Sequence, residues 1–199
     1  MKNVLLLFTL IHTVPTLSGQ PTIVNIRYQN LTSKPDGDTI YYKPGLQLTW
    51  ADFKGKPNLH SNTGAVTSSG ISLQSSIQQE ETKIIITLQV YAYFDKKSSW
   101  KKPNVHDAYH LTHEQNHLDI TYLGAIELIR RLKLEKFTMQ NFSETIDRVC
   151  KEVNSENDHL QNQYDRETNF SINTSQQEIW NQKVRKMLKE ATNQPHPED

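Results

Sequence analysis

The sequence predicts an α+β fold in which an N-terminal antiparallel or mixed β-sheet is followed by three helices. Up to about Asp95, apolar and polar residues alternate, which is the period of half-buried strands. After Pro103, apolar residues recur every three or four positions, which is the period of helices. Strands that precede helices, rather than alternating with them, are typical of the α+β class.

The chain has 199 residues, which suits a single domain, and its charge balance excludes some partners. The formal net charge is +0 and the hydrophobic fraction is 35%, so there is no electrostatic case for a nucleic acid or an anionic membrane as a partner. Cys150 is the one cysteine, which rules out an internal disulfide. We interpret it as a buried small hydrophobe rather than a catalytic thiol.

The N-terminus is typical of a secretory signal peptide. A short basic start is followed by the apolar run 4–10 and by small residues that end at Gly19. We therefore predict a signal peptide over residues 1–19, with a buried N-terminal strand as the alternative. The prediction implies a secreted or periplasmic protein without a membrane anchor after cleavage. One domain then covers residues 20–192, and residues 193–199 form a disordered tail.

Alternation predicts short strands near residues 24–28, 39–42 and 46–50. The two longest alternating stretches, 71–77 and 84–94, are separated by a short connection and predict an antiparallel hairpin. In the second of these, one face is apolar and the other is wetter. Such a sheet packs one face under helices.

Three helices are expected in the second half of the chain. The first begins at Asn104 or Asp107 and continues to about Leu134. The second begins at Asn141, and the third begins near Ser175. In both, Glu stands three residues after the starting Asn or Ser, as in a capping box.

The first predicted helix contains the motif His113-Glu114-Gln-Asn-His117. Residues four positions apart lie one turn apart on the same helical face, so the two imidazoles can bind one metal ion. Glu114 projects from the edge of that face and can act as the general base toward an activated water. Because imidazole suits zinc and the chemistry needs no redox change, Zn²⁺ is the expected cofactor.

A catalytic zinc site needs a third protein ligand, which the motif does not contain. A third His six residues after His117 would fall on Leu123, and Asp119 points about 200° away from His117. Glu127 lies roughly 15 Å further along the helix. The ligand is therefore expected from the end of the second helix, with Asp165 and His159 as candidates.

His106 and His110 fall on the same helical stripe as His113 and His117. This stripe leaves open a second hypothesis, metal sequestration by four histidines. We expect the helix to begin between His106 and His110, with neither residue as a ligand.

Several segments together resemble a bacterial family of predicted secreted zinc-dependent proteases, catalogued as domain of unknown function 922. They are Leu48-Thr-Trp50-Ala-Asp52-Phe53-Lys-Gly55, Phe94-Asp95-Lys-Lys-Ser-Ser-Trp100, His113-Glu114-Gln115-Asn-His117-Leu-Asp119-Ile120 and Tyr164-Asp165-Arg-Glu167-Thr168. The resemblance spans residues 46–181 and implies a zinc peptidase-like, zincin-like domain with the metal motif on its first helix. It does not imply a substrate or a physiological role.

The resemblance has one departure. In the family, a His often stands two residues after the Thr of the Tyr-Asp-x-x-Thr segment, but this chain has Phe170 there, followed by Ser171. If that His is the family's third ligand, this chain lacks it. If the Asp is the ligand, Asp165 is intact, and we predict that it is.

The expected function is peptide-bond hydrolysis by a secreted zinc metallopeptidase, with His113, His117 and Asp165 on the metal and Glu114 as the general base. A peptide or protein substrate could pair its backbone with an exposed strand edge. Tyr164 could assist the tetrahedral oxyanion, although core packing is the favoured role for it. The alternative is a non-catalytic secreted binding module that keeps the peptidase fold. The oligomeric state stays open.

Overall fold

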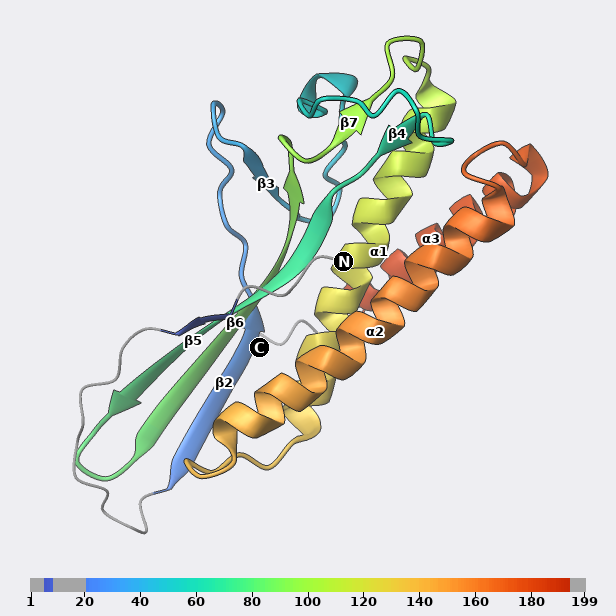
Figure 1. Ribbon diagram of the computed structural model, residues 1–199. Coiled ribbons are helices and arrows are strands. Elements are labelled where there is room, and N and C mark those ends of the chain that lie inside the picture. Colours follow the sequence, from blue (N-terminus) through green and yellow to red (C-terminus); the bar gives the residue numbers. More distant parts are fainter. Residues whose placement is uncertain (1–5, 9–20, 194–199) are drawn as a thin grey trace.

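The computed structural model describes residues 6–8 and 21–193 and has the predicted α+β class, a sheet followed by three helices (Figure 1). The main sheet is mixed. Its strands are β1 (Leu6–Phe8), β2 (Thr22–Tyr28), β3 (Thr39–Tyr41), β5 (Ser69–Gln79) and β6 (Ile84–Asp95). They run in the order β1-β5-β6-β2, and β3 also pairs with β6.

The centre of this sheet is the predicted hairpin. β5 and β6 pair antiparallel from Ser69 opposite Phe94 to Gln79 opposite Ile84, which confirms the expected antiparallel hairpin. β2 runs parallel to β6, whereas β3 runs antiparallel to it. On β6, the side chains of Ile86, Leu88, Val90, Ala92 and Phe94 are fully buried, as the alternation predicts.

A second, two-stranded sheet pairs β4 (Ala65–Val66) antiparallel with β7 (Trp100–Lys101). β4 continues almost directly into β5, so one stretch of chain passes from the small sheet into the large one. Figure 1 shows β4 and β7 beside the first turns of the first helix.

The helices are α1 (Ala108–Leu134), α2 (Phe142–Thr168) and α3 (Thr174–Asn193). Asp107 is the N-cap of α1, and its carboxylate accepts a hydrogen bond from the His110 amide. The capping-box predictions for the other two helices are wrong. Asn141 precedes α2, but its side chain bonds Thr138 and Lys136 in the preceding loop, and Asn173 rather than Ser175 accepts a bond from the first turn of α3.

α1 is the central element of the fold. One side of it packs on β2, β5 and β6, and the other side packs on α2 and α3 (Figure 1). The predicted apolar stripe, which includes Leu118, Tyr122, Ala125, Ile129 and Leu132, is buried against the sheet. Because both sides of α1 are covered, polar residues on its helix-facing side are buried as well. This explains how a histidine pair can lie inside the protein rather than on its surface.

The predicted strand at residues 46–50 is wrong. Trp50–Asp52 is a short 3₁₀ helix, and the preceding chain turns at Gly45, where φ is +85°. The Leu48 amide donates a hydrogen bond of 2.8 Å to Oε1 of Gln115, instead of to a neighbouring strand. Apolar alternation here reflects burial of Leu48 against α1, not sheet pairing.

The predicted ends of the chain lie largely outside the described residues. The signal-peptide prediction covers residues 1–19, of which 6–8 are described, as β1. The predicted tail begins at Asn193, which is the last residue of α3, and residues 194–199 are outside the description. Within the described ranges, no helix combines the length and apolar character needed to cross a membrane. The prediction for Cys150 is confirmed, because it is buried, and burial raises the pKa of its thiol to about 12.

Candidate metal centre

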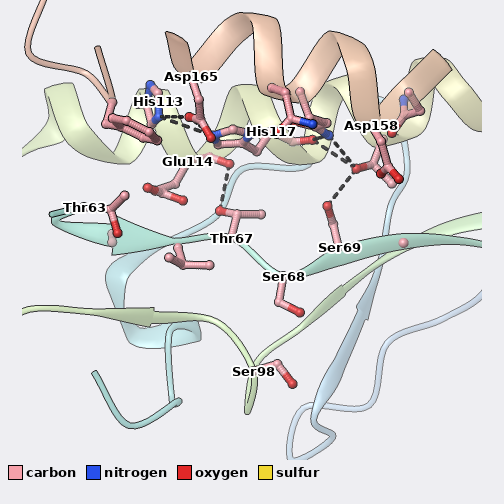
Figure 2. Close-up of a pocket in the computed structure, with 18 of the residues that line it drawn as sticks. Thr63, Thr67, Ser68, Ser69, Ser98, His113, Glu114, His117, Asp158 and Asp165 are labelled. Carbon is pink, nitrogen blue, oxygen red and sulfur yellow. Dashed lines mark hydrogen bonds and ion pairs between the residues drawn. The ribbon is translucent and has the colours of Figure 1, made fainter. Parts of the chain in front are cut away.

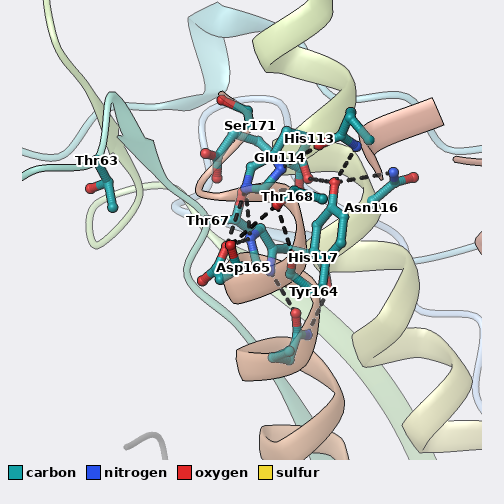
Figure 3. Close-up of polar contacts among 12 residues, drawn as sticks. Thr63, Thr67, His113, Glu114, Asn116, His117, Tyr164, Asp165, Thr168 and Ser171 are labelled. Atoms are coloured by element: carbon teal, nitrogen blue, oxygen red, sulfur yellow. Dashed lines mark hydrogen bonds and ion pairs between the residues drawn. The ribbon is translucent and has the colours of Figure 1, made fainter. Parts of the chain in front are cut away.

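The structure brings His113, His117 and Asp165 together between α1 and α2 (Figure 3). His113 and His117 lie one turn apart on α1, with their Nε2 atoms 3.2 Å apart. Asp165 enters from the last turn of α2, and its Oδ1 lies 3.2 Å from Nε2 of His113 and 3.0 Å from Nε2 of His117. Among the described residues this is the one cluster of potential metal ligands.

The other nitrogen of each imidazole is held by a glutamine. Nδ1 of His117 lies 2.6 Å from Oε1 of Gln161, and Nδ1 of His113 lies 2.8 Å from Oε1 of Gln177. The amide orientation of Gln161 is fixed, because its Nε2 donates to the carbonyl oxygen of His117 at 2.9 Å. An amide oxygen only accepts, so Nδ1 of His117 carries a proton and donates it.

Nδ1 of His113 contacts Oε1 of Gln177 in the same way. The Nε2 atoms of both imidazoles therefore face the Asp165 carboxylate. In the neutral imidazoles these Nε2 atoms carry lone pairs. Two nitrogen lone pairs and one carboxylate oxygen then converge on one point. Such a donor set attracts a cation, and a hydrogen-bonded outer nitrogen is the usual feature of metal-binding histidines.

The pKa values of His117 and Asp165 are shifted by the attraction between the carboxylate and the imidazoles. Burial acts to lower the pKa of His117, but the hydrogen bond and charge of Asp165 outweigh it and raise that pKa to about 9. For Asp165, burial acts to raise the pKa, yet the hydrogen bonds from His113 and His117 hold it well below its usual range. A carboxylate that stays ionised beside two imidazoles favours a positive charge between them.

Glu114 lies beside the cluster with an unpartnered carboxylate oxygen. The residue is 4% exposed, and its Oε2 is buried without a hydrogen-bond partner. Its backbone carbonyl accepts a hydrogen bond from Thr67 at 3.0 Å, which links α1 to the strand side of the site. Figure 2 shows the side chain directed into the space between α1 and the segment from Thr63 to Thr67, which contains β4. A buried carboxylate oxygen normally finds a donor, so this one is suited to a ligand or a water.

The cluster opens into a pocket of about 520 Å³. One wall is the continuous run of residues 63–71, which includes β4 and the start of β5. The other walls come from α1 and α2 and end at Phe170 and Ser171. Glu114 and all three members of the cluster line this pocket, so a molecule bound there can reach them.

The remaining histidine candidates lie elsewhere. His159 is exposed on α2 and does not belong to the cluster. His106 precedes α1, and its Nδ1 contacts the carbonyl oxygen of Asn104. His110 lines the pocket, but its Nδ1 is bound to the Asp107 carboxylate at 2.8 Å. The four-histidine stripe therefore does not converge on one point.

Tyr164 packs against the cluster from inside. Its ring stacks on His113 with a centroid distance of 4.6 Å, and it is completely buried. Its hydroxyl accepts hydrogen bonds from Gln177 and Asn116, which point it into the helix interface rather than into the pocket. This favours the packing role for Tyr164 over contact with an oxyanion.

Sequence patterns do not single out Gln161, Gln177 or Thr67. A glutamine on a helix carries no signal of its own. The spacing of Gln161 to Asp165, four residues on one face of α2, could have indicated that both reach the same neighbour. Gln177 belongs to α3, and no local pattern connects it with His113.

Comparison with known proteins gives one match. No curated protein and no solved structure matches the chain. Residues 82–171 match the sequence model of a family described as "Bacterial protein of unknown function (DUF922)". The matched region contains the whole cluster, Glu114 and the hairpin strand β6. This region of the chain is thus similar to that bacterial family of unknown function.

Proposed function

We propose that the protein is a secreted or periplasmic zinc-dependent peptidase with a zincin-like fold. One observation carries the proposal. Three donor atoms from His113, His117 and Asp165 converge in a pocket that also holds the unpartnered carboxylate oxygen of Glu114. Two imidazoles and one carboxylate are a ligand set found in catalytic zinc sites, where a fourth position stays open.

The chain's own residues fit zinc well. His113, His117 and Asp165 would hold the ion, and Gln161 and Gln177 keep the imidazoles in the tautomer that binds it. A zinc ion bound there supplies Lewis-acid chemistry, which makes a water acidic near neutral pH and polarises a carbonyl group. The cluster is accessible from the pocket, which residues 63–71 line on the opposite side.

Glu114 performs the proton transfers in this proposal. Its Oε2 accepts a proton from the attacking water as the new C–O bond forms at the peptide carbonyl carbon. Glu114 then donates this proton to the peptide nitrogen, the C–N bond breaks, and an amine and a carboxylic acid leave. The oxygen is suited to this role because no other group of the described protein occupies it.

The strand side of the pocket favours an extended peptide as the substrate. β4 pairs with β7 on one edge, and in the described part of the chain no strand pairs with its other edge. Residues 65–67 line the pocket opposite α1. An extended peptide can bind such an edge through backbone hydrogen bonds, whatever its side chains are.

The test combines zinc content with peptide hydrolysis. We expect about one zinc per wild-type chain and measurable cleavage of a peptide library. The Glu114→Gln variant should keep its zinc, and its cleavage rate should fall by at least ~100-fold, the lower end of the range for general acid–base catalysis. Glu144→Gln, an exposed change in the first turn of α2, is the matched control and should leave both unchanged.

The outcomes separate the three functions considered: a peptidase, a non-catalytic binding module and a metal-sequestering protein. Hydrolysis that Glu114→Gln leaves intact would contradict the general-base role. Stoichiometric zinc without cleavage of any peptide would favour a non-catalytic binding module. A content of two or more zinc ions per chain would support metal sequestration by the histidine stripe instead.

A further inference from the structure

The turn between α2 and α3 holds three consecutive residues in the left-handed conformation. The φ angles are 49° at Asn169, 51° at Phe170 and 72° at Ser171, and no other non-glycine residue in the described ranges has positive φ. Asn tolerates this conformation, but a residue with a bulky side chain is strained in it. The turn therefore contains a bulky residue, Phe170, in an unfavourable backbone conformation.

The chain reversal explains only part of this geometry. The Asn169 amide donates to the carbonyl oxygen of Arg166, and the Phe170 amide donates to that of Asp165 at 2.9 Å. These are the two bonds of a Schellman motif, which requires one left-handed residue, here Asn169. Phe170 is a second left-handed residue that the motif does not need. Glycine would suit this position better.

The contacts of the turn fix Phe170 at the metal end of the pocket. The hydrogen bond from its backbone amide to the Asp165 carbonyl oxygen ties Phe170 to the residue that supplies the carboxylate of the cluster. On the next residue, the Ser171 carbonyl accepts a hydrogen bond of 2.6 Å from the Tyr109 hydroxyl of α1. The turn is thus anchored on both helices that hold the metal ligands.

Phe170 lines the pocket, and core packing does not account for it. The residue is 39% exposed, and it is absent from both apolar clusters of the core. Most other residues that line the pocket carry hydroxyl, amide, imidazole or carboxylate groups. An aromatic ring in a largely polar pocket, on a strained backbone, points to a ligand contact.

We propose that Phe170 is a specificity-determining residue, whose ring forms an apolar wall for a bulky apolar side chain of the substrate. The proposal rests on the proposed function in that the substrate is a peptide whose scissile bond lies at the metal cluster. Because Phe170 adjoins Asp165, the recognised side chain belongs to a residue close to that bond. Apart from Glu114 and the cluster, the described residues that line the pocket include one carboxylate, that of Asp158, and no lysine or arginine.

The test measures binding and stability separately. The probes are fluorescent hexapeptides of Ser and Gly in which one Phe is moved through every position, and zinc-loaded Glu114→Gln protein is used so that no peptide is cleaved. We expect one position at which Phe strengthens binding about 10-fold, the order that one apolar pocket contact provides. In the double variant with Phe170→Gly this preference should vanish, while the melting temperature rises by roughly 2–4 °C as the strain is relieved.

Asn169→Gly is the matched control. This change places glycine at another left-handed position of the same turn. Asn169 does not line the pocket, so the preference for Phe in the peptide should remain. A preference that survives Phe170→Gly, or the absence of a preference at any position, would overturn the proposal. Because binding needs no turnover, a wild-type protein without peptidase activity would refute the proposed function and leave this result interpretable.

Discussion

Gln161 is the residue that orients His117. It accepts the Nδ1 proton of His117 and donates to the backbone carbonyl of the same residue, so one side chain fixes both ring and tautomer. A further bond of 3.1 Å from its Nε2 reaches the Thr121 hydroxyl. Gln161 is thus a positioning residue, which in the proposed site would act on the metal through His117.

Replacing Gln161 should weaken zinc binding without unfolding the protein. In Gln161→Met the side chain keeps its size but cannot accept the Nδ1 proton, so the imidazole loses its fixed tautomer and orientation. We expect zinc affinity to fall by about 10–100-fold, the usual effect of such partners. Competition with a chromophoric chelator measures it.

The control for this change is Gln163→Met. Gln163 lies on the same helix, but it bonds Glu167 away from the cluster. Zinc affinity should be unchanged in this variant. Equal affinity losses in both variants would show that α2 as a whole, and not the Gln161 contact, controls the site.

At the scale of elements, the close approach of α1 and α2 depends on Gly124. A Cβ atom at this position would lie 2.5 Å from Nδ2 of Asn157 on α2 and 2.9 Å from Cδ1 of Ile71 on β5. Asn157 is also fixed, because it donates to the carbonyl oxygen of Ile120. A side chain at position 124 would therefore require the Asn157 amide and the end of the Ile71 side chain to shift.

Gly124→Ala should separate the two helices that carry the ligands. Overpacking costs about 1–3 kcal/mol, which outweighs the gain of up to about 1 kcal/mol in helix propensity. We expect a lower melting temperature and weaker zinc binding together, because Asp165 and Gln161 move with α2. Calorimetry with and without zinc measures both. Ser155→Ala, at an exposed position of α2, should change neither, and an unaltered melting temperature in Gly124→Ala would contradict the packing argument.

The elements differ in how well the sequence predicts them. The β5–β6 hairpin and the three helices follow from periodicity, because each has an apolar face that packs on its neighbours. The segment around Leu48 was misassigned as a strand, because a side chain from α1 binds its backbone. Local alternation cannot distinguish pairing with a strand from docking on a helix.

At the scale of the whole molecule, the cluster depends on contacts between distant segments. His113 and His117 follow from helical spacing alone. Asp165 lies about fifty residues later and could be proposed only as one of two candidates, because α2 can present either His159 or Asp165 depending on its rotation about its axis. Packing of α2 on α1 and α3 selects Asp165 and leaves His159 in solvent.

Zinc should stabilise the whole protein more strongly as the pH rises. In the metal-free protein the pKa of His117 is raised to about 9, against an ordinary value of 6.5. A raised pKa contributes stability that is complete below about pH 6.5 and is lost as the pH rises through about 9. Zinc must displace the same proton, so its affinity increases over this window. The two effects act together, because the metal-free state weakens while zinc binding tightens.

We therefore expect the zinc-induced rise in melting temperature to grow between pH 6.5 and 8.5. Each tenfold gain in affinity adds about 1.4 kcal/mol of stabilisation at constant excess zinc. Differential scanning calorimetry with zinc or with chelator, at matched ionic strength, measures the difference. In Asp165→Asn the growth should largely disappear, because the Asp165 carboxylate is the main group that raises the pKa of His117. A zinc effect that shrinks with pH in the wild type would contradict metal binding at His117.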